Sequence, residues 1–516
     1  MAGFFSDVQV FGAEHVPKEG PLIVCCTHWN MIVDVGDIHL AQSQRPLRSF
    51  PARDTLMLFP SSSEAALSTI FINAAVNWLL RDAGNISVDR KNRDNQALFA
   101  GTFEVLKLGE VVAIFPEGTS YTEPRMQDLK EGASWAALEY AKNLHDVDPG
   151  HKGTQAATLV VASIVYTKKT NYRTRAVMQF SAPIDMRPFI EEFLSTTDAA
   201  KVAVKKLTRA IKEQMVTMTV NAPDWETIRA AETARELLWG DDSHVPLRQF
   251  QSITQTLVDL FSPFSPPSSA ASSARSTLID YEACLRSNFY TNASLNALPL
   301  PRILDPLHSA PPPERLRTLL ALVKATLSSL VLLPFFLLPL LAHTPIYVIG
   351  KGTQLYLNTD EPEAYAQNKI VFSLLVLLLV IYPSIFFFTW ALFLFTPLGL
   401  AVALCWTAAF SYYHTRLVDG NYAQWKRLVA AWRVLLGLWS PGRGEETRRM
   451  LKLRSEAAKG VADLLFSLEK EPFDAGGSSG SLRDKVDWFR SLGARIGKAR
   501  GGLADESDQH GRLKQG

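Results

Sequence analysis

The fold is decided by residues 22–34, LIVCCTHWNMIVD, in which an apolar run stops at a histidine. The first five residues, 22–26, are apolar and rich in β-forming side chains, which is typical of a strand buried in a parallel sheet. A polar segment follows at once and contains His28 and Asp34, six positions apart. Six positions turn through roughly 600° on a regular helix, so the two side chains would point to different faces. If they act together, we expect an irregular loop that leads into a helix.

Residues 1–185 alternate short apolar runs with helical patterns around this stretch. Strands are predicted at 22–26, 48–51, 86–89, 111–115, 158–166 and 175–180, and helices at 68–82, 95–108 and 132–144. This alternation predicts an α/β domain with a mostly parallel sheet flanked by helices. Ligands of such sheets bind beyond the carboxyl ends of the strands, and three polar motifs follow predicted strands in that way.

The composition argues against several classes of protein. The 516 residues carry 53 Lys and Arg against 51 Asp and Glu, so no nucleic acid partner is expected. The four cysteines and ten histidines show no metal-ligand spacing and no disulfide pattern, so we predict neither a metal nor a cofactor. Cys25 and Cys26 are interpreted as small core residues in a reducing, cytosol-facing compartment. Residues 1–12 contain no sustained apolar core, so no signal peptide is expected.

Three apolar segments late in the chain predict contact with a membrane. They lie at 326–341, extendable to 349, and at 370–392 and 400–412, and the run from 370 to 412 contains no Asp, Glu, Lys or Arg. Prolines interrupt the first segment, so it is kinked or re-entrant. Basic residues after 416 favour a cytosolic C-terminus, which with a cytosolic N-terminal domain requires an even number of crossings. One segment is therefore expected to be re-entrant or to lie in the interface, and the stretch 425–439 could lie on the membrane surface.

Four parts of the chain follow from these patterns. They are an α/β domain at 1–185, a helical cap with a flexible Ser/Pro-rich segment at 186–310, a membrane region with two or three transmembrane or re-entrant helices at 311–440, and a polar, partly disordered tail at 441–516. A helix is expected near 482–492 in the tail. The sequence assigns no function to residues 186–310.

The second polar motif is residues 84–93, GNISVDRKNR, in which Arg90 and Arg93 follow a predicted strand. A planar guanidinium group matches a phosphate bidentately, so the motif suits a phosphorylated ligand. The alternative is a solvated basic loop.

The third polar motif is residues 115–120, FPEGTS, in which an apolar strand stops at a proline. Glu117 can accept hydrogen bonds from a polyol, and Gly118 permits a positive φ or a close backbone approach. Thr119 completes the candidate binding set. The alternative is a structural turn.

The order of the motifs is more specific than any one of them. His-x5-Asp, Gly-x3-Val-x-Arg and Phe-Pro-Glu-Gly, followed by the apolar strand at 160–166, resemble the glycerolipid acyltransferase superfamily over about residues 8–185. Residues 115–120 and 129–133, FPEGTS and LKEGA, look most like fungal-type glycerol-3-phosphate/dihydroxyacetone-phosphate acyltransferases. Two features depart from the superfamily pattern: five residues instead of four separate the His from the Asp, and Ala162-Ser163 replaces the usual proline of the fourth block.

The resemblance implies a reaction and a set of roles. The enzyme would move a fatty acyl group from acyl-CoA, its co-substrate, to the sn-1 hydroxyl of glycerol 3-phosphate or dihydroxyacetone phosphate and give lysophosphatidate. His28 would be the general base and Asp34 would orient it. Arg90 and Arg93 would bind the phosphate, and residues 117–119 would bind the acceptor. The expected location is the endoplasmic reticulum membrane, multi-pass, with the catalytic domain facing the cytosol.

Two other functions stay open at this point. The acceptor could be lysophosphatidate or another lysophospholipid, because a phosphate on any of these would suit Arg90. From a different class, the chain could be a membrane-shaping hairpin or a scaffold, which would leave the order of the polar motifs unexplained. Thioester hydrolysis by a serine lacks support, because the sequence has no Gly-x-Ser-x-Gly elbow.

Overall fold

The computed structural model describes residues 5–28, 55–58, 85–86, 99–118, 120–147, 156–168, 174–240, 242–263, 269–295, 298, 315–356, 362–417, 423–439, 444–470 and 482–496. By its contacts the chain forms two compact units, Met1–Asn221 with Pro334–Asn421, and Ala222–Leu333 with Tyr422–Gly516.

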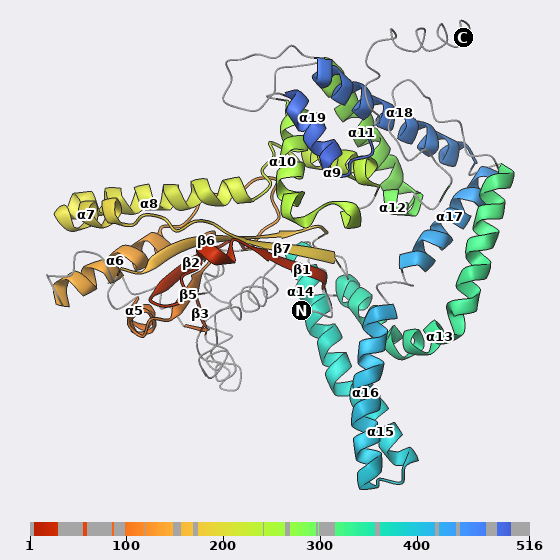
Figure 1. Cartoon of the computed structure of the whole chain (residues 1–516), viewed down its shortest axis with the longest axis horizontal. Helices are drawn as coiled ribbons and strands as arrows, with labels where there is room; N and C mark the ends of the chain where they lie inside the picture. The colour runs from red at the N-terminus through yellow and green to blue at the C-terminus, as the bar shows by residue number, and fades with distance from the viewer. Residues whose placement is uncertain are drawn as a thin grey trace, which may run out of the picture. The chain divides into compact units, whose positions relative to one another are not determined.

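The described residues of the first unit contain a seven-stranded sheet in the order β1-β7-β6-β2-β5-β3-β4 (Figure 1). The strands are β1 (Phe5–Phe11), β2 (Leu22–Cys26), β3 (Thr55–Leu58), β4 (Asn85–Ile86), β5 (Val111–Ile114), β6 (Thr158–Tyr166) and β7 (Thr174–Phe180), and a short helix, η1 (Ala13–His15), follows β1. Neighbouring strands are parallel except β6 and β7. The predicted mostly parallel sheet is confirmed, whereas β1 and β3 were not predicted and the strand expected at 48–51 lies outside the described residues.

Strand β2 lies in the middle of the sheet, as its uniformly apolar sequence predicts. Leu22 is opposite Val111 of β5 on one side and Thr158 of β6 on the other. All five residues of β2 are buried, and burial raises the pKa of the Cys25 thiol to about 12. The interpretation of this cysteine as a small core residue is confirmed, because its side chain is fully buried in the sheet.

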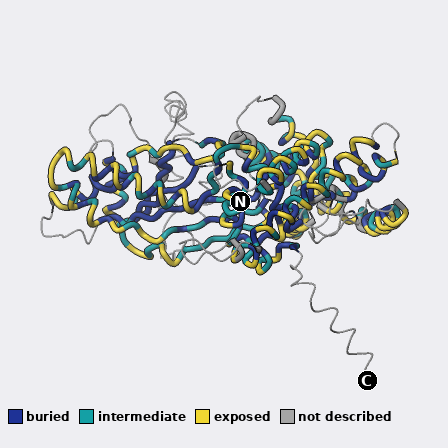
Figure 2. Tube along the Cα trace, turned by 90° about the horizontal axis from the view of Figure 1, so that it is seen from above, coloured by how far each residue is buried: buried dark blue, intermediate teal, exposed yellow. Residues whose placement is uncertain are grey.

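Helices α5 (Ala100–Lys107), α6 (Gly132–Val147), α7 (Arg187–Ser195) and α8 (Thr197–Met218) pack on one face of the sheet. Alternate strand residues such as Ile23 and Cys25 meet them in one buried cluster, and Figure 2 shows dark blue inside this part of the chain with yellow on its outer segments. Thr196 caps α8 by accepting a hydrogen bond from the backbone N of Ala199 at 3.2 Å. Helices α5 and α6 confirm the predictions at 95–108 and 132–144, and the helix predicted at 68–82 lies outside the described residues.

The first unit also contains a helical hairpin. Its first arm is α14 (Pro362–Val376), the π-helical turn η4 (Leu377–Ile381) and α15 (Tyr382–Leu392), and its second arm is α16 (Pro397–Leu417). The π-turn precedes Pro383, which has no N–H to continue the regular ladder. Among the described residues, Asn368–Leu392 is the one segment long and apolar enough to cross a membrane, with a mean hydropathy of 2.7. The spans expected at 326–341 and 400–412 stay predictions.

The second unit is helical in its described residues. Its elements are α9 (Trp225–Trp239), η2 (Asp242–His244), η3 (Leu247–Gln249), α10 (Phe250–Phe261), α11 (Ser269–Ser287), α12 (Asn292–Leu295), the first part of α13 (Arg315–Tyr356), α17 (Ala423–Trp439), α18 (Gly444–Lys470) and α19 (Leu482–Ser491). Its core holds the guanidinium of Arg235, which donates to Asp242 at 3.0 Å and to Thr254 at 2.7 Å. Helix α19 confirms the helix expected near 482–492.

Candidate active site

The site is built where β2 and β5 end. These strands are parallel neighbours, with Cys25 opposite Ile114, so their carboxyl ends meet at one edge of the sheet. His28 lies two positions beyond β2 and Glu117 three positions beyond β5. The fold therefore brings together two of the motifs that the sequence places after strands.

His28 is held at this edge through both its ring and its backbone. Its ring stacks on that of Phe115, with 4.3 Å between centroids and 30° between planes. Its backbone N donates to Oε1 of Glu117 at 2.6 Å. The residue is only 6% exposed. A histidine in this setting is a fixed part of the fold rather than a mobile surface side chain.

Thr27 fastens the same segment to the strand on the other side. Its backbone N donates to the carbonyl oxygen of Ala162 at 3.1 Å, and its hydroxyl accepts from the backbone N of Ile164 at 3.0 Å. Both partners belong to β6. The Thr27–His28 step is thus clamped between β6 and the turn that follows β5.

The carboxylate of Glu117 is the second fixed group. The residue is 3% exposed and receives the His28 backbone N–H. It also forms a hydrogen bond with the Tyr121 side chain, whose own hydroxyl accepts from the backbone N of Gln127 at 2.9 Å. Burial and the neighbouring Glu117 carboxylate raise the pKa of Tyr121 well above its usual range. Tyr121 therefore stays protonated and acts as the donor to Glu117.

Gly118 closes the turn in a conformation that favours glycine. Its φ is +82°, and its backbone N donates to the Phe115 carbonyl oxygen at 3.2 Å. The backbone N of Lys130 donates to the Pro116 carbonyl oxygen at 2.7 Å, which brings the Lys130 side chain over Gly118. A Cβ at residue 118 would lie 2.5 Å from Lys130 Cε and 2.6 Å from its Nζ. The use of glycine here has two physical causes, the backbone angle and the lysine above it.

Sequence reasoning assigned no role to Lys130, although residues 129–133 contributed to the resemblance. The structure places its ammonium group beside the turn that carries Glu117. The signal in the sequence was the segment LKEGA. Because this segment is separated in sequence from the strand motifs, the contact between Lys130 and Gly118 could not be predicted from it.

The other predicted site residues lie outside the described residues. They are Asp34, Arg90, Arg93 and Thr119. Strand β4, which precedes Arg90 in the sequence, is parallel to β3 and so ends at the same edge as β2 and β5. The roles of these four residues stay predictions.

The fourth block belongs to the core of the sheet, as expected for most of its residues. The Ser163 hydroxyl donates to the carbonyl oxygen of Met218 at 2.8 Å. Tyr166, at the end of β6, stacks on Phe5 with 5.6 Å between centroids. The block therefore joins β6 to α8 and to β1.

This geometry can support proton transfer. The imidazole of His28 is buried, and its backbone segment is held by hydrogen bonds on two sides. It can therefore face a bound hydroxyl without a loop having to become ordered first.

The comparison with protein families agrees with this description. Residues 7–149 match the family model described as Acyltransferase. This match identifies residues 7–149 as an acyltransferase domain, and it includes His28, Asp34, Arg90 and Glu117. The resemblance inferred from the order of the motifs is confirmed.

Individual relatives from yeasts are acyltransferases by name. Glycerol-3-phosphate O-acyltransferase 2 of Saccharomyces cerevisiae is 29% identical over 171 residues, which are 33% of this chain and 22% of the relative. Glycerol-3-phosphate O-acyltransferase 1 of the same yeast is 27% identical over 144 residues, 28% of this chain and 18% of the relative. An uncharacterized acyltransferase of Schizosaccharomyces pombe is 30% identical over 129 residues, 25% of this chain and 18% of the relative. The aligned part of the chain spans about a fifth of the length of these relatives.

Proposed function

We propose that this chain is a membrane-bound acyltransferase that moves a fatty acyl group from acyl-CoA to the sn-1 hydroxyl of glycerol 3-phosphate or dihydroxyacetone phosphate. The product would be lysophosphatidate or its keto analogue. The observation that carries the proposal is the hydrogen bond between His28 and Glu117, which joins two motifs of an acyltransferase domain at one edge of its sheet.

The reaction needs little from the protein beyond a base and a precise arrangement. The thioester is already activated, so no covalent enzyme intermediate is required. His28 takes the proton of the acceptor hydroxyl while its oxygen attacks the thioester carbonyl, which typically contributes about 10²–10⁴-fold to the rate. The carbon–sulfur bond then breaks, and the thiolate of coenzyme A takes the proton from the imidazolium. An ester bond replaces a thioester bond, and the base is restored.

The remaining predicted residues take positioning roles in this scheme. Asp34 orients the imidazole and favours its protonated form. Arg90 and Arg93 hold the acceptor phosphate at a fixed distance from the attacking hydroxyl, and such positioning can supply much of the acceleration. No cofactor takes part.

The role of Glu117 in this proposal differs from the acceptor binding that the resemblance implies. Its Oε1 is occupied by the His28 backbone, and the residue is 3% exposed. We assign it mainly to holding His28 at the strand end, and we keep residues 118 and 119 as predicted acceptor-binding residues. Gly118 leaves room for the Lys130 side chain, which lies over it.

Membrane attachment is part of the same proposal. The apolar segment Asn368–Leu392 supports it, as do the further apolar stretches in α13 and α16. We propose a multi-pass or re-entrant protein of the endoplasmic reticulum membrane with its acyltransferase domain in the cytosol, beside the bilayer that receives the product.

The experiment uses the purified full chain in phosphatidylcholine vesicles with radiolabelled oleoyl-CoA. Glycerol 3-phosphate, dihydroxyacetone phosphate and lysophosphatidate are offered separately, and the lipid product is identified by chromatography. We expect acylation of the first or second acceptor. Product from lysophosphatidate alone would establish the lysophospholipid alternative, and no product from any acceptor would favour the scaffold alternative.

A histidine pair tests the proposed base in the same assay. His28→Ala should lower kcat by about 10³-fold or more. His145→Ala, at an exposed position near the end of α6, should retain full activity. An active His28→Ala variant would contradict the assignment.

A further inference from the structure

The turn between α15 and α16 is apolar and exposed. Its four residues 393–396, FLFT, join the two arms of the hairpin, and Leu394 is 85% exposed and Phe395 59%. Leu398, in the first turn of α16, is 71% exposed. Turns that face water are usually polar, because polar side chains and water complete their hydrogen bonds.

The backbone angles make the choice of residues more unusual. Leu394 has a φ of +48° and Phe395 a φ of +56°. Glycine, asparagine and aspartate are the residues that adopt this region at little cost, and a large apolar residue there costs about 1–3 kcal/mol. Two consecutive large apolar side chains occupy this conformation despite its cost. This indicates that an apolar surface is favoured at the turn.

The backbone N–H groups of the turn donate within the turn itself. The backbone N of Leu394 donates to the Ala391 oxygen at 2.9 Å, and that of Phe395 donates to the Trp390 oxygen at 3.1 Å. The backbone N of Thr396 donates to the Phe393 oxygen at 3.1 Å.

The side chains of the turn complete the set. The Thr396 hydroxyl donates to the Phe393 oxygen at 3.0 Å and accepts from the backbone N of Gly399 at 3.1 Å. The indole N of Trp390 donates to the Thr396 oxygen at 3.0 Å. A turn whose donors are used internally has fewer unpaired polar groups to bury when it leaves water.

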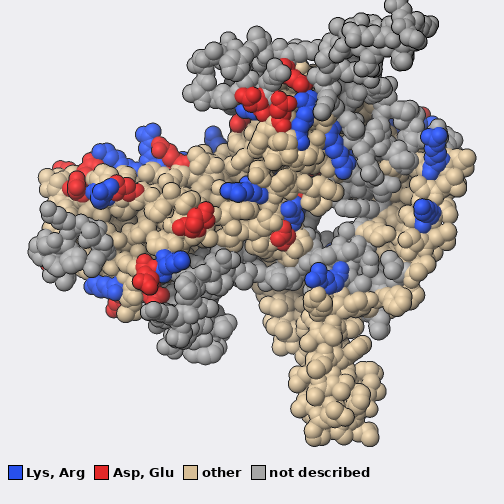
Figure 3. All heavy atoms as spheres, viewed as in Figure 1, with Lys and Arg blue, Asp and Glu red and all other residues tan. Residues whose placement is uncertain are grey.

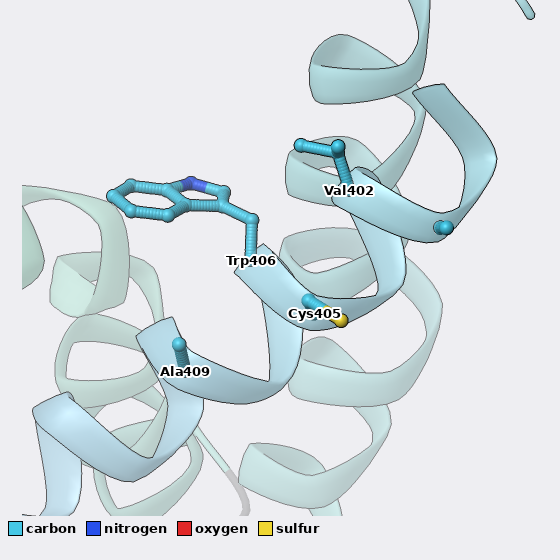
Figure 4. A pocket seen from close by; sticks show the side chains of 5 residues that line it. Val402, Cys405, Trp406 and Ala409 are labelled. Carbon is cyan, nitrogen blue, oxygen red and sulfur yellow. The ribbon is translucent and has the colours of Figure 1, made fainter. Parts of the chain in front are cut away.

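Both arms of the hairpin are apolar from the turn to the polar residues at their other ends. Between Lys369 and Arg416 the sequence has no Asp, Glu, Lys or Arg, and Figure 3 shows no charged side chain on the end of the hairpin. The arms lie side by side (Figure 1), and the Tyr382 and Ser411 hydroxyls join them at 2.8 Å. The outer surface of α16 bears a shallow apolar groove of about 400 Å³, in which Trp406 stands beside the small residues Cys405 and Ala409 (Figure 4).

The length of the arms decides how deep the turn can reach. From Pro397 to Tyr412, where exposed tyrosines begin, α16 rises about 23 Å at ~1.5 Å per residue. The start of the first arm packs on the α/β domain, because Ile370 contacts the cluster of Phe5 and Ala176. The large side chains of this arm become exposed only from Leu374 onward. A hydrocarbon core is about 30 Å thick, so a turn at this depth stays inside it.

We propose that the α14–α16 hairpin enters the bilayer and turns back within its hydrocarbon core, so that both arms return to the side of the acyltransferase domain. The partner of this surface is the acyl region of a phospholipid bilayer. The inference rests on the membrane attachment in the proposed function but not on the reaction.

The test measures the depth of single spin labels in phosphatidylcholine vesicles. The full chain carries Cys284→Ala and Cys405→Ala to remove the more accessible native thiols, and one new cysteine at a time: Leu394→Cys or Leu398→Cys at the turn, Tyr412→Cys at the base and Ser195→Cys as a water-exposed control. We expect labels at 394 and 398 to collide readily with oxygen and several-fold less with the water-soluble nickel complex Ni-EDDA than the label at 195. The label at 412 should be intermediate.

The outcomes separate this inference from membrane attachment. Flotation of the vesicles with the protein, together with Ni-EDDA access at both 394 and 398, would mean that the turn emerges into water, which overturns the inference and leaves attachment intact. Failure of the protein to float would overturn both. Because two turn positions are labelled, a local disturbance at Leu394 does not decide the result.

Discussion

The end of β5 and the turn after α15 lie in one unit and satisfy their polar groups in opposite ways. At the sheet edge, His28 uses Glu117, which is 89 positions away. At the hairpin turn, Trp390 uses Thr396, six positions away. The edge is therefore complete only when the whole sheet has formed, whereas the turn needs nothing outside itself. A site for chemistry requires the first arrangement, and insertion into lipid requires the second.

This difference separates the expected effects of mutations. Changes at the sheet edge should alter catalysis and folding together, because the hydrogen bonds that fix the imidazole also join the strands. Changes at the turn should alter membrane insertion and leave the turnover of the domain unchanged.

After His28→Ala, the largest effect should come from Glu117→Ala. Two donors, the His28 backbone N and the Tyr121 hydroxyl, would lose their acceptor in a buried place, which costs about 1–3 kcal/mol for each unsatisfied group. We expect kcat/KM to fall by about 10²-fold, within the range for a misplaced base, with a lower thermal midpoint in detergent. Glu123→Ala, an exposed carboxylate in the same loop, is the control and should match the wild type. Equal activity of the two variants would refute the coupling of fold and catalysis at this edge.

Arg90→Ala tests whether the phosphate is bound at the same edge. A charge-assisted hydrogen bond contributes about 1.5–3 kcal/mol, so KM for glycerol 3-phosphate should rise about 10–100-fold. KM for acyl-CoA should change little. Steady-state kinetics with each substrate varied in turn would reveal this split, and an equal rise in both KM values would remove the phosphate role.

Gly118→Ala should have a smaller effect than either. The φ of +82° costs an alanine about 1–2 kcal/mol, and its Cβ would push the Lys130 side chain aside. We expect a destabilisation of that size and a several-fold loss of kcat/KM. Gly132→Ala, where a Cβ would meet nothing within 4 Å, is the matched control. Similar stability of the two alanine variants in thermal unfolding would rule out this account of the turn.

The smallest effect should come from Thr396→Val in the hairpin turn. The substitution removes two hydrogen bonds of the hydroxyl, each contributing about 0.5–1.5 kcal/mol. The protein should stop floating with the vesicles at a lower denaturant concentration than the wild type, while kcat stays unchanged. Thr396→Ser should behave as the wild type. A loss of kcat in Thr396→Val with normal flotation would contradict the separation of the two regions.

The sequence predicted the centre of the sheet because its strands are uniformly apolar. Strands β2, β5 and β6 were placed for that reason, whereas β1 was missed because its sequence, FSDVQVF, mixes polar and apolar residues at the edge beside β7. The sheet edge as a site also followed from strand order, since β2 and β5 are parallel.

The contacts within the site could not be predicted in the same way. The motif order predicted acceptor binding for Glu117, and the structure shows its Oε1 accepting a hydrogen bond from the His28 backbone N. Nothing in the spacing of residues 28 and 117 specifies that hydrogen bond, because it depends on the turn after β5 and on Tyr121. The position of Lys130 over Gly118 depends on a second long-range contact of the same kind.

A double-mutant cycle between His28 and Glu117 decides whether these two residues act as one unit. The kcat/KM of the wild type, His28→Ala, Glu117→Gln and the double variant would be measured on the accepted acyl acceptor. If Glu117 acts by holding the imidazole, Glu117→Gln should cost about 30-fold with His28 present and less than about 3-fold in its absence, since coupled residues are not additive. The same loss in both backgrounds would contradict the proposal that Glu117 works through His28.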